Sequence, residues 1–140
     1  MVSLVLAKVM KEAGLRAFIG KLSMDTSSRP SYVEPSAQAS LDSAASFVEK
    51  CCALDEAKGP RLIEPILSPR FVPTCSDTLL HGLGELAAQG RNSVPLRIQS
   101  HLAESEDQIA WVRSTRQADD IDVFDKVRYL IRAKHSSYYY

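Results

Sequence analysis

Apolar residues recur along most of this chain at positions i, i+3, i+4 and i+7, the spacing of an amphipathic helix. Ser3 and Ser76 stand where such helices would begin, and Gly14 and Gly90 stand where they would end. The pattern predicts helices at residues 3–13, 36–54, 76–90, 105–116 and 122–127. The buried stripe of the first helix is expected to consist of Leu6, Val9, Met10 and Ala13.

Short apolar runs at residues 16–23, 61–68 and 96–101 alternate with these helices and are predicted to be strands. Strands that alternate with helices form parallel sheets through right-handed crossovers. Two architectures fit, an open doubly wound sheet and an arc of a (β/α)8 barrel. No glycine-rich dinucleotide or phosphate loop follows a strand, so the first architecture lacks its best marker. A barrel takes about 250 residues, so this α/β chain would be roughly half of one, a partial TIM barrel.

Charge and composition exclude several classes of function. Seventeen basic and seventeen acidic side chains cancel, so bulk charge gives no basis for binding nucleic acid or an anionic membrane surface. No apolar run approaches the roughly 18 residues that a membrane span needs. The start of the chain has no basic region before its apolar residues, which favours a helix over a signal peptide. Three irregularly spaced cysteines favour reduced thiols in the cytoplasm.

Residues capable of chemistry stand at all three predicted strand ends. Met24 and Asp25 follow the first strand, Arg70 and Phe71 follow the second, and His101 ends the third. In parallel α/β folds the carboxyl ends of the strands form the working face, so these residues are expected to share one rim. The Ser- and Pro-rich loop after the first strand is longer than most such connections, which is also typical of a working face.

His101 and Glu104 form the most informative pair. A neutral imidazole at a barrel mouth can bind zinc, and a carboxylate three residues later can move protons. His101 could equally be a structural or surface residue, and Glu104 an acid stabilised by a helix N-terminus. Arg70 can donate to a carbonyl oxygen while Phe71 stacks on a flat heterocycle. Their simpler interpretation is a loop residue and a hydrophobic anchor.

Strand alternation adds a prediction about charge. Arg97 shares its side of the strand with His101, and Glu64 and Lys21 are expected on the corresponding side of the other strands. We expect these charges to pair in the barrel interior, because unpaired buried charge is costly.

Three segments of the chain resemble guanine deaminases of the metal-dependent amidohydrolase superfamily, in matching order and spacing. They are Arg16–Asp25, Leu67–Ser76 and Gln99–Glu104, and the resemblance extends to about Val127. The combination of Ser-Pro-Arg-Phe with Ser-His-x-x-Glu is specific for this family among amidohydrolases. The resemblance implies a (β/α)8 barrel that hydrolyses guanine to xanthine and ammonia with one zinc.

Carried over by motif, His101 would be a zinc ligand that also contacts the substrate, and Glu104 the catalytic proton shuttle beside the purine. Arg70 and Phe71 would hold the guanine ring. The resemblance further implies a cytoplasmic enzyme, homodimeric at full length, that binds neither nucleic acid nor membrane.

The resemblance also implies that the site is incomplete in these 140 residues. The family's His-x-His pair and its later histidine and aspartate ligands have no counterpart, and one imidazole does not hold zinc in a defined site. The chain alone is therefore predicted to be inactive. Residues 1–128 are expected to form a partial barrel domain, and residues 129–140 an aberrant or disordered tail. Half a barrel would also expose strand edges and apolar faces.

Two other functions remain open at this point. One is a different amidohydrolase, such as a chlorohydrolase-like or adenosine-type deaminase. The other is a non-catalytic α/β binding module, which would melt cooperatively without zinc.

Overall fold

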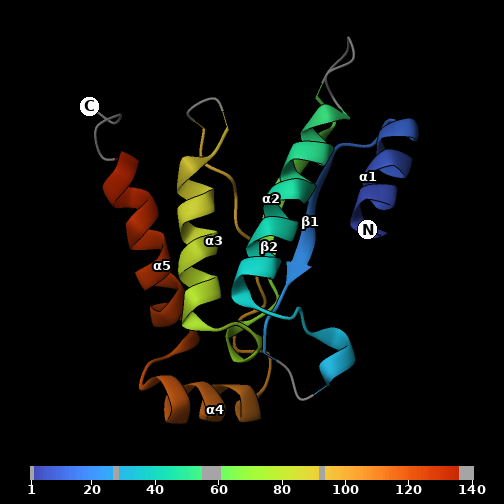
Figure 1. The fold of residues 1–140 in the computed structure, drawn as a ribbon. Helices are drawn as coiled ribbons and strands as arrows, with labels where there is room; N and C mark the ends of the chain where they lie inside the picture. Colours follow the sequence, from blue (N-terminus) through green and yellow to red (C-terminus); the bar gives the residue numbers. More distant parts are fainter. Residues whose placement is uncertain (1, 27–28, 55–60, 92–93, 136–140) are drawn as a thin grey trace.

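The computed structural model describes residues 2–26, 29–54, 61–91 and 94–135, with side chains up to residue 127. Helices alternate with strands from the N-terminus up to β2, and the last three α-helices then follow one another among the described residues (Figure 1). The elements are α1 (Val2–Glu12), β1 (Ala17–Ser23), the 3-10 turn η1 (Pro30–Tyr32), α2 (Ala37–Ala53), β2 (Ile63–Pro69), the 3-10 turn η2 (Val72–Thr74), α3 (Asp77–Gln89), α4 (Glu106–Arg116) and α5 (Asp120–His135). None of the helices in these ranges combines the length and the apolar character that crossing a membrane requires.

The two strands pair in parallel, in a register that runs from Ala17 opposite Ile63 to Ser23 opposite Pro69. The predicted third strand lies beside β2 as an extended segment with one parallel bridge, between Leu67 and Ile98. The Leu67 N–H donates to the carbonyl of Arg97 at 2.9 Å, and the Gln99 N–H donates to the carbonyl of Leu67 at 3.0 Å. The α/β class and the parallel strands are thus confirmed, although residues 96–101 form a bridge and not a full strand.

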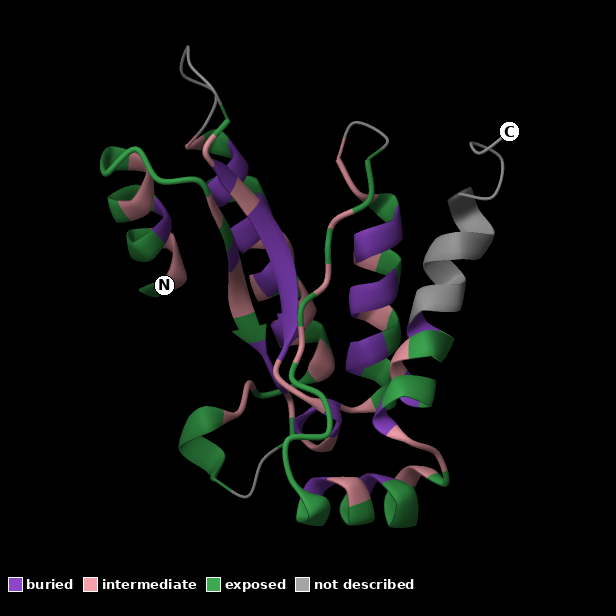
Figure 2. Ribbon diagram, turned by 180° about the vertical axis from the view of Figure 1, so that it is seen from behind, coloured by how far each residue is buried: buried purple, intermediate pink, exposed green. Residues whose placement is uncertain are grey.

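Helices α2 and α3 cover one face of this sheet, and the core lies between them and the strands (Figures 1 and 2). Each helix buries one apolar stripe, as the amphipathic spacing predicts, with Cys51 and Cys52 of α2 and Leu79, Leu83 and Ala87 of α3 almost fully enclosed. Ser76 caps α3 by accepting a hydrogen bond from the Leu79 N–H at 3.1 Å. Both helices therefore form where an apolar stripe and an N-cap coincide.

The buried stripe predicted for the first helix is wrong except at Met10. In α1 the enclosed residue is Ala7, flanked by the partly buried Leu4 and Met10, whereas Leu6 and Val9 are exposed. The helix is amphipathic, yet the apolar side that carries Leu6 and Val9 faces away from the core. The small Ala7 fits against Ile19 and Phe47 in the core, and this tertiary fit sets the orientation of α1.

The last helix extends further than its sequence pattern predicts. Helix α5 begins at Asp120 and continues to His135, past the proposed boundary at residue 128, and Val123 and Val127 are buried in the core that includes α3. The division into a domain of residues 1–128 and a tail of residues 129–140 therefore stays a prediction. Residues 136–140 lie outside the described residues.

The sheet face opposite the helices is open over β1, where Phe18 and Leu22 are exposed. Arg97 and Glu64 pair on this face at 2.9 Å, as predicted, but their side chains are 68% and 42% exposed. The expected burial of this pair is wrong, because no described element covers them. Lys21 points to the opposite face, where it pairs with Glu34 at 2.6 Å.

Candidate functional site at the carboxyl ends of the strands

Both strands point towards the end of the molecule where η1 and α4 lie (Figure 1). The backbone of Arg70 joins the three strand ends there. Its N–H donates to the carbonyl of Ser23 at 3.1 Å, and its carbonyl accepts from the His101 N–H at 3.1 Å. The Ser100 hydroxyl also donates to this carbonyl at 3.3 Å. We call this junction the rim, and it places Arg70 directly beside His101, as the strand order predicts.

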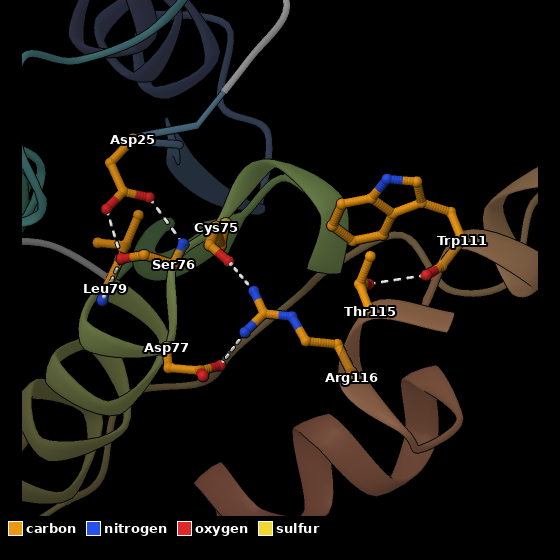
Figure 3. A network of polar contacts seen from close by, with 8 residues as sticks. All are labelled: Asp25, Cys75, Ser76, Asp77, Leu79, Trp111, Thr115 and Arg116. Carbon is orange, nitrogen blue, oxygen red and sulfur yellow. Dashed lines mark hydrogen bonds and ion pairs between the residues drawn. The ribbon is translucent and has the colours of Figure 1, made fainter. Parts of the chain in front are cut away.

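Asp25, at the end of β1, has a structural role on the rim. Its carboxylate accepts from the N–H of Ser76 at 2.8 Å and from the Ser76 hydroxyl, and that hydroxyl in turn caps α3 (Figure 3). The carboxylate therefore stabilises the N-terminus of α3, where the helix dipole favours negative charge. Met24 is buried, and its sulfur lies 3.8 Å from a guanidinium nitrogen of Arg70.

Arg70 and Phe71 open onto a cavity of about 690 Å³. The guanidinium of Arg70 stacks on the Phe71 ring, with 5.2 Å between its central carbon and the ring centroid. The cavity is bounded by the loop after β1, the loop after β2 and one side of α4. Its lining residues are Thr26, Arg29, Tyr32, Arg70, Phe71, Pro73, Thr74 and Trp111. They include two guanidiniums and no carboxylate, and this volume lies within the range typical of small-molecule sites.

His101 and Glu104 form a contact pair next to this cavity but are not among its lining residues. The Nδ1 atom of His101 lies 3.1 Å from Oε1 of Glu104, and the side chains are 50% and 56% exposed. The pair closes because the backbone of Ala103 adopts the left-handed conformation, with φ of +48°. When Nδ1–H donates to the carboxylate, Nε2 keeps its lone pair and can accept a proton or bind a ligand.

The turn that carries Glu104 is anchored by α4 and α5. The Glu104 N–H donates to the side-chain oxygen of Gln108 at 3.3 Å, and the Gln108 amide donates to Asp120 at 2.7 Å. Gln108 and Asp120 are both buried. The position of Glu104 is thus set by the N-terminus of α5 as well as by its own loop.

A zinc site does not form from the side chains that the structure describes. Within them, no three His, Cys, Asp or Glu residues gather as a metal-binding group. His101 brings one imidazole to the rim, and His81 is exposed on α3 at a different cavity. Catalytic zinc needs three protein ligands, so His101 and Glu104 alone do not fit it.

Cys75 is buried directly after η2, and its thiol is not a nucleophile at neutral pH. Burial raises the pKa of its thiol to about 11. The thiol donates to the carbonyl of Ser23 at 3.4 Å. The Cys75 carbonyl accepts from Arg116 of α4 at 2.8 Å, so this residue connects β1 with α4 (Figure 3).

Tyr32 and Trp111 are cavity residues that the sequence did not single out. The length of the loop after β1 did point to a working face, and Tyr32 lies in that loop. Trp111 is the only tryptophan of the chain and stands outside the buried stripe of α4, which contains Val112. An exposed aromatic residue on a mostly polar helix face was the signal available for it.

Comparison with known proteins finds guanine deaminases among the relatives of this chain. No model of a protein family matches the chain. A guanine deaminase of Dictyostelium discoideum is 42% identical over 110 residues, which cover 79% of this chain and 22% of the relative. A probable guanine deaminase of Schizosaccharomyces pombe is 34% identical over 130 residues, covering 91% of this chain and 24% of the relative. The chain therefore spans about a quarter of the length of these relatives.

Solved structures agree with this match. A guanine deaminase of C. acetobutylicum, with guanine bound in its active site, is 33% identical with a TM-score of 0.72, and the match covers 89% of this chain and 28% of that one. A zinc-bound adenosine deaminase of Xanthomonas campestris has a TM-score of 0.66 over 88% of this chain and 25% of its own, but at 20% identity it is similar in fold alone.

The chain is therefore similar to a segment of hydrolases of the amidohydrolase kind. Within that class it corresponds to a segment of the guanine deaminases, which confirms the resemblance seen in the sequence.

Proposed function

We propose that this chain is the segment of a guanine deaminase that holds the purine ring and supplies an acid–base group. One observation carries the proposal: the Arg70 backbone is hydrogen-bonded to His101, so the Arg70–Phe71 cavity and the His101–Glu104 pair adjoin on one rim. The relative with guanine bound, 33% identical over most of this chain, supports guanine as the ligand. In this proposal the segment is part of a (β/α)8 barrel.

The reaction would replace the exocyclic amino group of guanine with oxygen from water, yielding xanthine and ammonia. Arg70 would donate to the ring oxo group, and Phe71 would stack on the flat ring. Glu104 would accept a proton from the attacking water and give one to the leaving amine. These roles need an arginine, an aromatic ring and a carboxylate around one base, and the rim has all three within neighbouring loops.

Zinc belongs to this proposal only for the whole protein, with His101 as one of its ligands. The described residues do not supply the remaining ligands, so we derive no step through the metal. A homodimer and a cytoplasmic location are likewise proposed for the whole protein, on the basis of the family resemblance alone.

Guanine binding by the 140-residue chain tests the proposal. Saturation-transfer NMR should detect guanine on the wild-type chain in preference to adenine, which lacks the oxo group. Replacing Arg70 with Lys keeps the positive charge but removes the planar guanidinium with its paired N–H donors. This substitution should weaken guanine binding about tenfold. Arg97→Lys is the matched control, because Arg97 pairs with Glu64 on the open sheet face. Equal binding of guanine and adenine, or equal effects of the two substitutions, would refute the proposal.

Catalysis provides a second test. The chain with added zinc should form no xanthine, because its ligand set is incomplete. In a whole protein that contains this segment, Glu104→Gln should remove the proton-transfer group and lower kcat by about two to four orders of magnitude. Xanthine production by the isolated chain would contradict the incomplete site, and unchanged kcat in the Gln variant would contradict the role of Glu104.

A further inference from the structure

Trp111 occupies an unusual place for a large apolar side chain. Its helix, α4, buries Gln108 and Val112, while the indole is 41% exposed and lines the cavity that Arg70 and Phe71 open onto. Leaving an indole half in water forgoes much of the stabilisation that its burial would give. An aromatic side chain turned from the core towards a ligand-sized cavity is placed to contact a ligand.

The position of Trp111 relative to Phe71 is fixed from both ends of α4. At the C-terminal end, Arg116 pairs with Asp77 and donates to the Cys75 carbonyl at 2.8 Å (Figure 3). At the other end, Gln108 is bound to Asp120 at 2.7 Å. Helix α4 also packs against η2, the turn that follows Phe71 directly. The indole is therefore held beside the cavity by the body of the fold.

The cavity chemistry indicates which ligand Trp111 would contact. Three aromatic side chains, Tyr32, Phe71 and Trp111, share the lining with the guanidiniums of Arg29 and Arg70. Aromatic faces stack on flat heterocycles, and guanidiniums donate to oxo groups. A six-membered ring with an amino and an oxo group could be held at Arg70 and Phe71 alone. A second fused ring needs further aromatic surface, and Trp111 and Tyr32 provide it.

We propose that Trp111 determines ring-size specificity, by stacking on the purine so that a bicyclic base is held in preference to a monocyclic one. This inference rests on the proposed function, since it takes guanine as the ligand. Arg70 then selects for the oxo group, and Trp111 selects for the fused five-membered ring. Isocytosine separates the two contributions, because it carries the amino–oxo ring of guanine without the five-membered ring.

Intrinsic fluorescence gives a direct measurement, because Trp111 is the only tryptophan of the chain. Guanine should quench this emission on binding, and isocytosine should quench it far less at equal occupancy by saturation-transfer NMR. Trp111→Leu should weaken guanine binding about tenfold, the order measured for stacking of one base, and isocytosine binding less than about twofold. Trp111→Phe, which keeps a flat ring, should retain most of the preference for guanine.

Phe18→Leu is the matched control, because Phe18 is an exposed aromatic residue on the open sheet face, outside the cavity lining. It should leave both ligands unaffected. If guanine binds but the emission of Trp111 does not change, the inference is overturned and the proposed function stands. The same holds if Trp111→Leu weakens guanine and isocytosine equally. If guanine does not bind to the wild-type chain, both fail. If the far-ultraviolet circular dichroism of Trp111→Leu shows that this variant is unfolded, the ligand preference of Trp111→Phe and the quenching in the wild-type chain decide whether Trp111 contacts the purine.

Discussion

The link between Asp25 and Ser76 offers a sharp test of how the rim is assembled. Replacing Asp25 with Ala removes an acceptor for two hydrogen bonds, from the N–H and the hydroxyl of Ser76. Hydrogen bonds to charged groups contribute about 1.5–3 kcal/mol each, and a carboxylate at a helix N-terminus about 0.3–1 kcal/mol more. Because Asp25 is only partly buried, we discount the sum and expect a loss of about 3 kcal/mol.

Asp25→Asn should cost about half as much, because the amide oxygen can still accept from the Ser76 N–H while the charge is lost. Urea unfolding followed by far-ultraviolet circular dichroism measures these free energies. Asp42→Ala is the control, since Asp42 accepts one bond from Gln38 on the exposed surface of α2 and should cost only about 0.5 kcal/mol. If Asp25→Ala and Asp42→Ala proved equal, the argument that Asp25 ties β1 to α3 would be refuted.

Three further predictions concern packing, backbone conformation and pH. Gly84→Ala should destabilise the chain by about 1 kcal/mol in urea unfolding, because its Cβ would lie 2.6 Å from a Val127 methyl and 3.2 Å from the Val127 carbonyl oxygen; an increase in stability would contradict the contact of α3 with α5. Ala103→Gly should raise stability by about 1 kcal/mol, because glycine tolerates the φ of +48°; a loss would argue against the left-handed turn. The pKa of Cys75 is raised in the folded state from 9.0 to about 11. The protonated thiol therefore contributes fully to folding stability below pH 9.0, and this contribution is lost as the pH rises to about 11. The difference in unfolding free energy between wild type and Cys75→Ala should therefore shrink over that interval by about 2–3 kcal/mol, and a constant difference would contradict the burial effect.

Local signals predicted most of the fold. Ser76 and Ser105 cap helices where expected, because an N-cap depends on residues within one turn. The orientation of α1 could not be predicted, since its apolar spacing favours the side with Leu6 and Val9, whereas the fit of Ala7 against the core buries another side. The sequence pattern predicted a full strand at residues 96–101, where the structure has a single bridge. Strand pairing depends on a partner that the local sequence does not specify.

The sequence predicted the candidate site only in part, because the geometry of the site also depends on contacts between distant segments. The spacing of His101 and Glu104 places them near each other, but their contact depends on the conformation of Ala103. The cavity depends on α4 lying across the rim, and this position is set by long-range contacts such as that of Arg116 with Cys75. The local sequence marked Trp111 as an aromatic residue on a polar helix face, but it did not indicate that Trp111 lies at the same cavity as Arg70.

The rim divides its functions between two sets of residues. Buried or partly buried groups such as Asp25, Cys75 and Gln108 set the geometry, through hydrogen bonds that connect β1, α3, α4 and α5. The side chains proposed to act on the ligand are more exposed, at 56% for Glu104 and 41% for Trp111. Exposed side chains add little to folding, so substitutions there should change binding or catalysis without unfolding the chain. A chain that keeps this rim can therefore keep the shape of the proposed purine site even where the ligands for a metal are incomplete.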